Sequence, residues 1–250
     1  MIWSAQRDIQ RMDKRPRTIK SMFDQIAPTY DLVNHILSLS IDIVWRQRTI
    51  RKLEIKHGDV ILDIATGTGD LALLALKENR GCRVVGIDLS GEMLHIATKK
   101  RDAKGYRTRY LLVQGDASNI PLKGHSFEHV MVAFGIRNVS NIGRLLREIR
   151  RTLKQEGRFA ILEFSVPQSH FMREIYLFYF KKILPLLGGL FSRKASAYRY
   201  LRDSVMAFHT PAELEHMLWE SGFTVLQSLS LWFGICHIFI AKKRMERPPQ

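Results

Sequence analysis

The sequence predicts an α/β protein with a mostly parallel sheet and helices on both of its faces. Short apolar runs alternate with helix-like segments over most of the chain, which is the pattern of βαβ units. The runs are almost continuously apolar, as parallel strands covered on both faces are. The length of 250 residues suits one domain with a full hydrophobic core.

The segments before the sheet are polar and then helical. We expect residues 1–20 to form a basic N-terminal arm and residues 21–56 a helical cap. The apolar periodicity then predicts the following elements in order: strands over 60–65, 83–88, 110–115, 129–134 and 158–165, and helices over 70–77, after the N-cap Ser90, and over 142–153.

The last third of the chain departs from this alternation. Residues 166–210 are expected to form an insertion, and residues 211–221 a helix. Strands over 224–231 and 237–242 predict a closing hairpin, with an antiparallel strand at the edge of the sheet. The sheet then has seven strands, residues 21–243 form a single domain, and residues 244–250 form a tail.

The charge balance is strongly basic. Lys and Arg number 39 against 24 Asp and Glu, a formal net charge of +15. This favours an anionic partner, either nucleic acid or an acidic membrane surface, but a solvated basic surface explains it equally well. Cys82 and Cys236 give no disulfide framework and no zinc spacing. We therefore expect no metal site and a cytoplasmic protein.

One segment, residues 171–191, is apolar enough to be compared with a membrane span. Arg173, Glu174, Lys181 and Lys182 interrupt it, and Pro185 would break a spanning helix. A buried or interfacial helix is the better prediction.

The strongest chemical signal is the glycine turn of residues 66–70 between the first strand and the next helix. Its glycines let the backbone approach a ligand, and the helix offers free N–H groups to an anion. A tight turn without a ligand would look the same. However, Asp88 ends the second strand, where an acid can bind a ribose diol, and Asp116 follows the third, where a carboxylate can reach an adenine amino group. Three successive strand ends therefore predict one nucleoside cofactor.

This trio resembles class I S-adenosylmethionine methyltransferases rather than NAD enzymes, because the turn lacks the full G-x-G-x-x-G pattern. The resemblance implies a Rossmann-like fold and S-adenosyl-L-methionine as the cofactor. The cofactor-binding residues that it implies are Asp63, Gly67, Thr68, Gly69, Asp88, Asp116 and Ala117. A carboxylate that merely orders the loop is an equal alternative for Asp63.

Further motifs, between about residues 23 and 243, resemble the UbiE/MenG/COQ5 family, whose members C-methylate ubiquinone and menaquinone precursors. They are Y-D-L-V-N at 30–34 with Ser38 and Trp45, F-G-I-R-N-V at 134–139, R-T-L-K at 151–154 with L-E-F-S at 162–165, and Y-R-Y-L-R-D-S-V at 198–205. The chain departs from the pattern at four places: Asp42 where the family usually has His, Ala133 for Ser, Gln155-Glu156 for Pro-Gly, and His209 for Pro.

The resemblance implies methyl transfer to a ring carbon of a prenylated quinol. A ring carbon becomes nucleophilic when its neighbouring hydroxyl ionises, and a cation can stabilise that phenolate. We expect Arg137 to do so, with Asn138 orienting the substrate or a water; a structural ion pair is the alternative for Arg137. His35 and His209 are alternative bases. Tyr198, Tyr200 and Arg202 are expected to contact the substrate, although lid packing would explain them equally well.

Several partners and activities stay open. Lys181, Lys182, Arg193 and Lys194 suit peripheral contact with an anionic membrane at the inner membrane face. An RNA methyltransferase and a non-catalytic component of a quinone-synthesis complex are the rival functions. No [DN]-P-P-[YF] segment, catalytic cysteine or interleaved basic and aromatic motif favours RNA, so we expect no nucleic acid partner. The sequence decides neither between benzoquinol and naphthoquinol nor between a monomer and a homodimer.

Overall fold

The computed structural model describes residues 13–179 and 195–244, and it contains a seven-stranded sheet with the strand order β3-β2-β1-β4-β5-β7-β6. The strands are β1 (Val60–Ile64), β2 (Arg83–Asp88), β3 (Tyr110–Gln114), β4 (Phe127–Ala133), β5 (Leu153–Phe164), β6 (Phe223–Leu231) and β7 (Cys236–Lys243). The first five are parallel to one another. The predicted mostly parallel, seven-stranded sheet is confirmed.

The closing hairpin is confirmed as well. Strand β7 is antiparallel to both of its neighbours, β5 and β6. It therefore lies one position inside the sheet, and β6 forms the edge.

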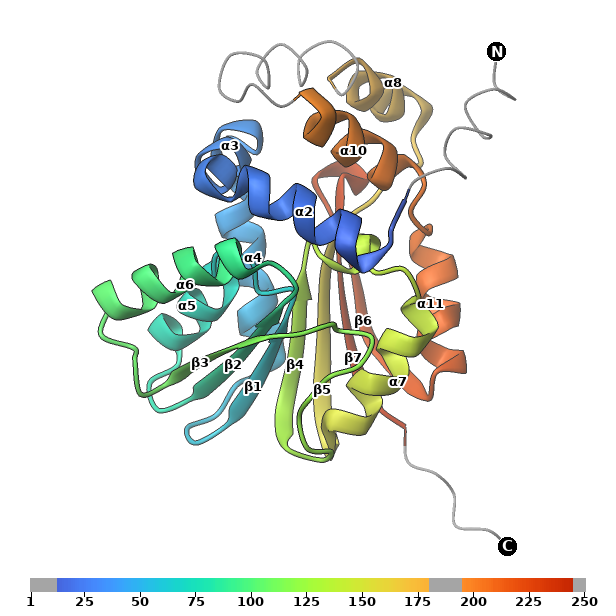
Figure 1. Cartoon of the computed structure of the whole chain (residues 1–250). Helices are drawn as coiled ribbons and strands as arrows, with labels where there is room; N and C mark the ends of the chain where they lie inside the picture. The colour runs from blue at the N-terminus through green and yellow to red at the C-terminus, as the bar shows by residue number, and fades with distance from the viewer. Residues whose placement is uncertain (1–12, 180–194, 245–250) are drawn as a thin grey trace, which may run out of the picture.

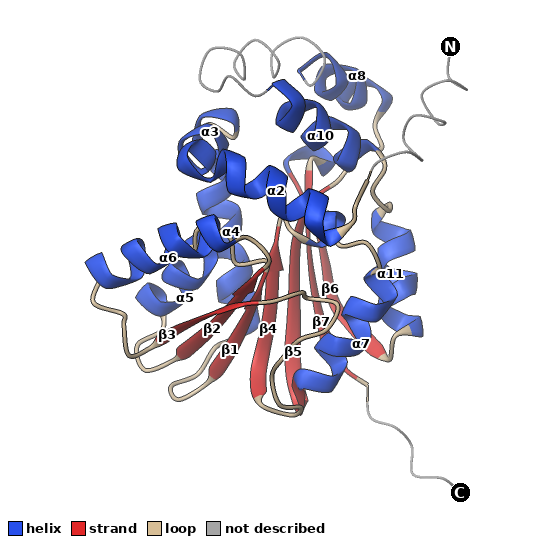
Figure 2. Ribbon diagram, viewed as in Figure 1, coloured by secondary structure: helices blue, strands red, loops and turns tan. Residues whose placement is uncertain are grey.

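Helices cover both faces of the sheet (Figure 2). They are α2 (Pro16–Ile26), η1 (Ala27–Thr29), α3 (Tyr30–Leu37), α4 (Ile41–Leu53), α5 (Asp70–Glu78), α6 (Gly91–Ala103), η2 (Ile136–Asn138), α7 (Ile142–Thr152), α8 (His170–Phe178), α10 (Ala195–Met206), α11 (Pro211–Glu220) and η4 (Trp232–Gly234). Helices α7 and α11 enclose one apolar core against the sheet, and α4 and α5 enclose the other.

Strand β1 shows why the strands read as continuous apolar runs. Leu62 and Ile64 belong to one core and Ile61 to the other, and all three are fully buried. Successive side chains of a strand point to opposite faces, so a strand covered on both faces is apolar at every position.

The N-terminal helices cross the carboxyl-terminal edge of the parallel strands (Figure 1). Helix α2 begins at Pro16, so the expected arm over residues 1–20 is wrong for its last five residues. Proline at the first helical position suits this start because its fixed φ matches the helix. Asp13 also accepts hydrogen bonds there from Arg15 N and Thr18 Oγ1. Farther along α2, Asp24 accepts a 2.6 Å hydrogen bond from Ser90 Oγ, which ties the cap to α6.

Helices α8 and α10 of the insertion lie above the same edge of the sheet (Figure 1). Lys181, Lys182, Arg193 and Lys194 lie outside the described residues. In the described ranges, no helix is both long enough and apolar enough to cross a membrane. Within the segment 171–191, the structure describes a helix that ends at Phe178.

Candidate active site

The glycine turn after β1 has the backbone that the sequence predicts. Gly67 and Gly69 have φ values of +57° and +87°, in the left-handed region that favours glycine. A Cβ on Gly69 would also stand only 3.0 Å from the hydroxyl of Tyr110. The turn therefore requires glycine at Gly69 for both its conformation and its packing.

Asp63, a buried residue of β1, holds this turn in place. It is 1% exposed and accepts a hydrogen bond from Thr66 Oγ1, which lies 2.7 Å from the Tyr110 hydroxyl. Burial raises the pKa of the Asp63 carboxyl to about 7. Asp63 does not line the pocket described next, so its position fits the loop-ordering alternative.

Asp88 stands at the carboxyl end of β2 and faces the turn. Its two carboxylate oxygens accept hydrogen bonds from the backbone N–H of Gly67, at 2.8 Å, and of Ser90, at 2.9 Å. The surrounding protein displaces water and raises the pKa of this carboxyl. The acceptor is thus oriented by two fixed backbone donors.

A pocket runs along the ends of β1, β2 and β3. Gly67, Asp88, Asp116 and Ala117 line it, together with apolar side chains that include Ile87, Leu89, Met93 and Val139. Gly135 closes one side, where a Cβ would approach the Ala65 Cβ to 2.6 Å. Two carboxylates beside an apolar slot, with a glycine where two loops meet, fit the ribose and adenine of a nucleoside cofactor.

Thr68 and Gly69 do not line this pocket. Thr68 is 2% exposed; its hydroxyl donates to Asp31 Oδ1 and accepts from Lys100 Nζ at 3.2 Å. Of the seven expected cofactor residues, four therefore lie on the pocket wall, and Asp63, Thr68 and Gly69 shape the loop behind it.

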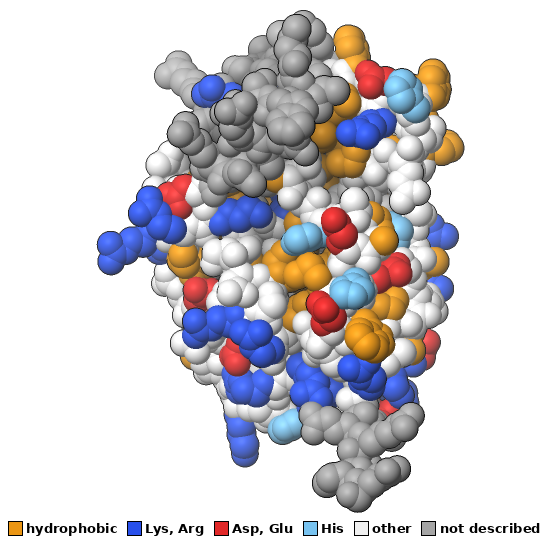
Figure 3. Space-filling model, turned by 90° about the vertical axis from the view of Figure 1, so that its right-hand side faces the viewer, with side chains coloured by type: hydrophobic (Ala, Val, Ile, Leu, Met, Phe, Trp, Pro, Cys, Tyr) orange, Lys and Arg blue, Asp and Glu red, His pale blue; other side chains and the backbone are white. Residues whose placement is uncertain are grey.

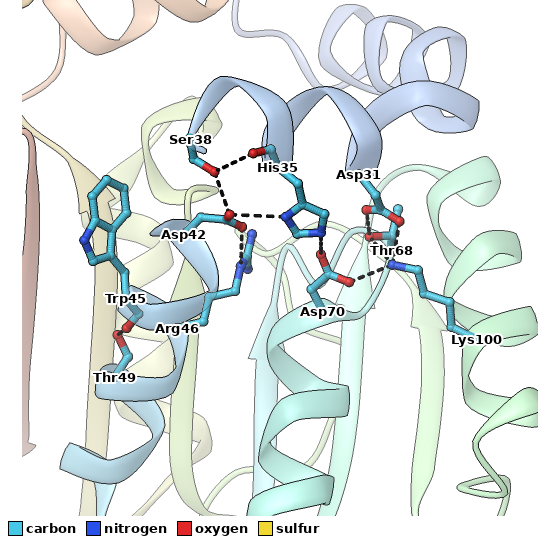
Figure 4. A network of polar contacts seen from close by, with 10 residues as sticks. All are labelled: Asp31, His35, Ser38, Asp42, Trp45, Arg46, Thr49, Thr68, Asp70 and Lys100. Atoms are coloured by element: carbon cyan, nitrogen blue, oxygen red, sulfur yellow. Dashed lines mark hydrogen bonds and ion pairs between the residues drawn. The ribbon is translucent and has the colours of Figure 1, made fainter. Parts of the chain in front are cut away.

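Thr68 belongs to a polar network that joins the N-terminal cap to the body of the domain (Figure 4). Lys100 Nζ forms ion pairs with Asp31 and, at 2.6 Å, with Asp70 Oδ1. His35 lies between Asp70 and Asp42 (Figure 4). Its two ring nitrogens are 3.7 Å from Asp70 Oδ2 and 3.2 Å from Asp42 Oδ1.

A larger cavity of about 490 Å³ adjoins the nucleoside pocket and shares Phe23, Tyr30 and Phe134 with it. Its wall is mostly apolar and aromatic. The Phe134 and Phe164 rings lie 4.6 Å apart, and the Trp45 ring packs against both at 6.4 Å. The remaining apolar and aromatic residues of this wall include Met22, Ile26, Met172, Ile175, Tyr176, Tyr179, Tyr200, Leu201, Trp232 and Ile235.

Arg137 brings a buried cation to this cavity. Its Nη1 donates to Glu163 Oε1 and to the Phe134 carbonyl, both at 2.6 Å, and its guanidinium lies 5.5 Å from the centre of the Phe164 ring. The next residue, Asn138, accepts a 2.9 Å hydrogen bond from the Tyr200 hydroxyl. The structure therefore brings Arg137, Asn138 and Tyr200 together.

Two of the expected substrate residues lie differently. Arg202 pairs with Asp203 at 2.7 Å and is not among the residues that line the cavity. Tyr198 lies in α10, but its side chain is outside the description.

Sequence reasoning missed Arg46 and Glu163. Arg46 lines the cavity, with its guanidinium 5.1 Å from the Phe134 ring centre. Nothing local distinguishes Arg46 from the other basic residues of α4. Glu163 lies in the L-E-F-S motif at 162–165, which could have drawn attention to it.

A Rossmann-like sheet with a glycine turn after β1 and acids that follow β2 and β3, all on one pocket wall, is the arrangement of a class I S-adenosylmethionine-dependent methyltransferase. The model of the ubiE/COQ5 methyltransferase family matches residues 10–243. The chain belongs to this family, and the resemblance seen in the sequence is confirmed.

Relatives and solved structures agree with this assignment. The chain is 39% identical, over 93% of its length and 99% of the relative, to a ubiquinone/menaquinone biosynthesis C-methyltransferase UbiE from Geotalea uraniireducens. It is 42% identical, over 88% of its length and 93% of the relative, to a demethylmenaquinone methyltransferase from Thermotoga maritima. A SAM-dependent methyltransferase from Aquifex aeolicus shares the fold, with a TM-score of 0.57 and 18% identity over 79% of this chain and 89% of that one.

Proposed function

We propose that the protein transfers the methyl group of S-adenosyl-L-methionine to a ring carbon of a prenylated quinol. The apolar cavity carries the proposal, because it places two buried guanidinium groups beside the nucleoside pocket. Relatives named for ubiquinone and menaquinone biosynthesis support it.

The bound cofactor supplies a methyl group that is already activated on a sulfonium. The protein must therefore make a ring carbon nucleophilic and hold it in line with that methyl. Ionisation of a neighbouring ring hydroxyl makes the ring carbon nucleophilic. Arg137 stabilises the resulting phenolate, and its contacts with Glu163 and the Phe134 carbonyl fix the guanidinium in advance, so little reorganisation is needed.

Asn138 and Tyr200 position the substrate ring. The Tyr200 hydroxyl donates to Asn138 Oδ1, which leaves the Asn138 amide N–H groups to face the substrate or a water. Burial raises the pKa of Tyr200 to about 12, so its hydroxyl stays a neutral donor at physiological pH.

The mouth of the cavity bears exposed apolar side chains. Leu39, Ile175 and Trp232 line the cavity and are 81%, 47% and 54% exposed. Phe171 and Phe233, on α8 and η4, are 72% and 74% exposed. A cluster of exposed apolar side chains of this kind marks an interaction site. In this proposal the mouth of the cavity rests on a bilayer surface, so that a prenyl tail can pass directly between the lipid and the cavity.

The main rival is RNA, and the placement of the basic groups opposes it. Lys and Arg gather on the lower part of the face shown in Figure 3. The basic residues that line a groove on the protein include Arg147, Arg150, Arg151, Lys243 and Arg244. These residues belong to the end of α7 and the end of β7, at the edge of the sheet opposite the cofactor pocket. The groove and the cofactor pocket share no lining residue, so a nucleotide held in this groove does not lie in the cofactor pocket.

A methyl-transfer assay with labelled S-adenosylmethionine tests the proposal. Demethylmenaquinol, a ubiquinol precursor that lacks the ring methyl, and bulk RNA are offered side by side in detergent. Label in a quinol would support the proposal and define which ring is accepted. Label in RNA alone, or in none of the three while the cofactor binds, would refute it.

A further inference from the structure

The polar network in Figure 4 connects the cavity wall to the protein surface. Asp42 lines the cavity and is 3% exposed. His35 lies against it, with Nδ1 3.2 Å from Asp42 Oδ1, and its Nε2 is 3.7 Å from Asp70 Oδ2. The His35 side chain is 31% exposed, so the imidazole also reaches solvent. One ring therefore spans the distance between a carboxylate at the cavity and the outside.

We propose that Asp42 and His35 form a proton relay that accepts the quinol hydroxyl proton and delivers it to solvent. This rests on the proposed quinol methylation. Methyl transfer to a ring carbon releases one proton in total, because a C–H becomes a C–CH₃ and the sulfonium charge disappears. That proton needs an acceptor, and neither Arg137 nor Arg46 can serve, since guanidinium groups stay protonated.

Protons and electron pairs are accounted for at each step of the relay. Asp42 takes the proton of a ring hydroxyl, and the electron pair stays on the ring oxygen. The new C–C bond forms as the methyl–sulfur bond breaks with its pair left on sulfur. The ring C–H proton then moves to the ring oxygen, which restores the hydroxyl and the aromatic ring. Asp42 passes its proton to Nδ1 of His35, and the Nε2 proton leaves to water, since an imidazole can accept at one nitrogen while it donates at the other.

Asp42 is held in the orientation that the relay needs. Ser38 Oγ donates to its Oδ1 at 2.6 Å, and Arg46 Nε approaches its Oδ2 at 3.4 Å. Asp70 Oδ2 lies 3.7 Å from Nε2 of His35, beyond hydrogen-bond distance, and places a negative charge beside that nitrogen. Asp42 alone holds the imidazole by a hydrogen bond, at Nδ1, and a carboxylate that orients an imidazole in this way is the arrangement of an oriented base.

Charged groups surround the imidazole of His35. They are Asp31 on its own helix α3, Asp42 and Arg46 on α4, Asp70 on α5 and Lys100 on α6. Three carboxylates against two cations make these surroundings negative.

The test compares His35→Gln and Asp42→Asn with the wild type. The kcat for quinol methylation is measured between about pH 5.5 and 9, and the affinity for S-adenosylmethionine is measured by titration calorimetry. We expect each variant to lower kcat by about 100-fold, the lower range for general acid–base catalysis. The pH profile of kcat should differ between the wild type and His35→Gln, because a glutamine side chain cannot carry the proton. Cofactor affinity should stay within about twofold.

Two further variants separate a relay from a structural contact. Imidazole added to His35→Ala should restore kcat in proportion to the fraction of neutral imidazole. The double variant His35→Asp/Asp42→His, which exchanges the two groups, should recover most of the activity lost by either single change. His216→Gln is the control, because the exposed His216 side chain pairs with Glu220 on α11, outside both cavities, and the change should leave kcat and its pH profile unchanged.

An unchanged pH profile in an active His35→Gln variant would overturn the relay. So would a loss of cofactor affinity that accounts for the whole loss of kcat, or a His35→Ala variant that imidazole does not restore. A wild type that methylates no quinol would overturn the proposed function first, and the relay with it.

Discussion

Arg137 Nη1 lies 2.6 Å from Glu163 Oε1, and the two residues are only 5% and 1% exposed. Arg137 follows β4 and Glu163 is near the end of β5, so two neighbouring strands hold the pair in place. The Glu163 carboxylate offsets the cost of burying the Arg137 cation. The guanidinium can therefore remain charged in an apolar cavity.

Replacement of this cation by a point charge is expected to impair methyl transfer. Arg137→Lys keeps the positive charge but cannot donate to Glu163 and the Phe134 carbonyl in the same planar fork. We expect kcat to fall by about 10- to 100-fold, while the affinity for S-adenosylmethionine stays unchanged. Arg202→Lys, at the half-exposed pair with Asp203, is the control and should keep its activity. Equal rates for the two variants would argue against Arg137 as the phenolate-stabilising group.

Asp88 is expected to control cofactor affinity. In Asp88→Ala, a ribose diol would lose a charged acceptor that two backbone N–H groups orient. Hydrogen bonds to charged groups contribute about 1.5–3 kcal/mol, so the Kd for S-adenosylmethionine should rise about 10- to 100-fold in calorimetry. Asp102→Ala, an exposed carboxylate on α6, should leave the Kd unchanged. A similar Kd in both variants would remove Asp88 from the cofactor site.

Asp63 should make stability depend on pH in an unusual direction. Burial raises the pKa of its carboxyl to about 7, from 3.8, so its contribution to folding is complete below about pH 4 and is lost as the pH rises through 7. Because Asn does not titrate, Asp63→Asn should gain stability relative to wild type across this range, by about 4 kcal/mol in total. Urea unfolding of both proteins at several pH values measures the difference. A difference that is constant with pH would show that Asp63 is not titrating there.

The Tyr200 hydroxyl should affect substrate use more than stability. Tyr200→Phe removes the donor to Asn138 and leaves the ring in the cavity wall. Loss of one such hydrogen bond costs about 1 kcal/mol, so kcat/KM for the quinol should fall about fivefold. Cofactor affinity and Tm should change little. Tyr106→Phe, on the loop before β3, provides the matched control, and an equal effect there would count against a role for the Tyr200 hydroxyl.

The apolar mouth of the cavity should decide membrane binding. Phe171→Ser/Phe233→Ser removes one large exposed ring from α8 and one from η4, the elements that also carry Ile175 and Trp232 of the cavity wall. Burial of one such ring in lipid contributes about 1.5–3 kcal/mol, so partitioning onto anionic vesicles should fall by more than about tenfold in co-sedimentation. Leu111→Ser, an exposed apolar position on β3, should bind vesicles as the wild type does. Unchanged partitioning of the double variant would contradict the proposed contact.

Most of the sheet could be predicted because parallel strands that are buried on both faces are apolar at nearly every position. Strand β5 shows the limit: it begins at Leu153, five residues before the predicted start. The polar stretch Lys154-Gln155-Glu156 conceals it, although Leu153 pairs with Phe127 on β4. The pairing of the buried Leu153 with β4, rather than the local sequence pattern, determines where β5 begins.

The candidate site was predictable where its residues stand at strand ends. Asp88 and Asp116 follow apolar runs, and the order of parallel strands brings them together. Arg46 could not be predicted in this way, because its place on the cavity wall depends on how α4 packs against residues far along the chain. Its guanidinium faces the ring of Phe134, which is far away in the sequence, and no local sequence pattern predicts a contact between them.

The contact of Trp45 with Phe134 and Phe164 also has a consequence for synthesis of the chain. The helix that carries Trp45 leaves the ribosome first, whereas both rings that cover Trp45 are added much later. Until Phe134 has been translated this indole lacks both of these rings, and until Phe164 has been translated it lacks one of them. The nascent chain must therefore carry an incompletely covered Trp45 while β1 to β4 are synthesised, the interval in which a chaperone would have a surface to bind.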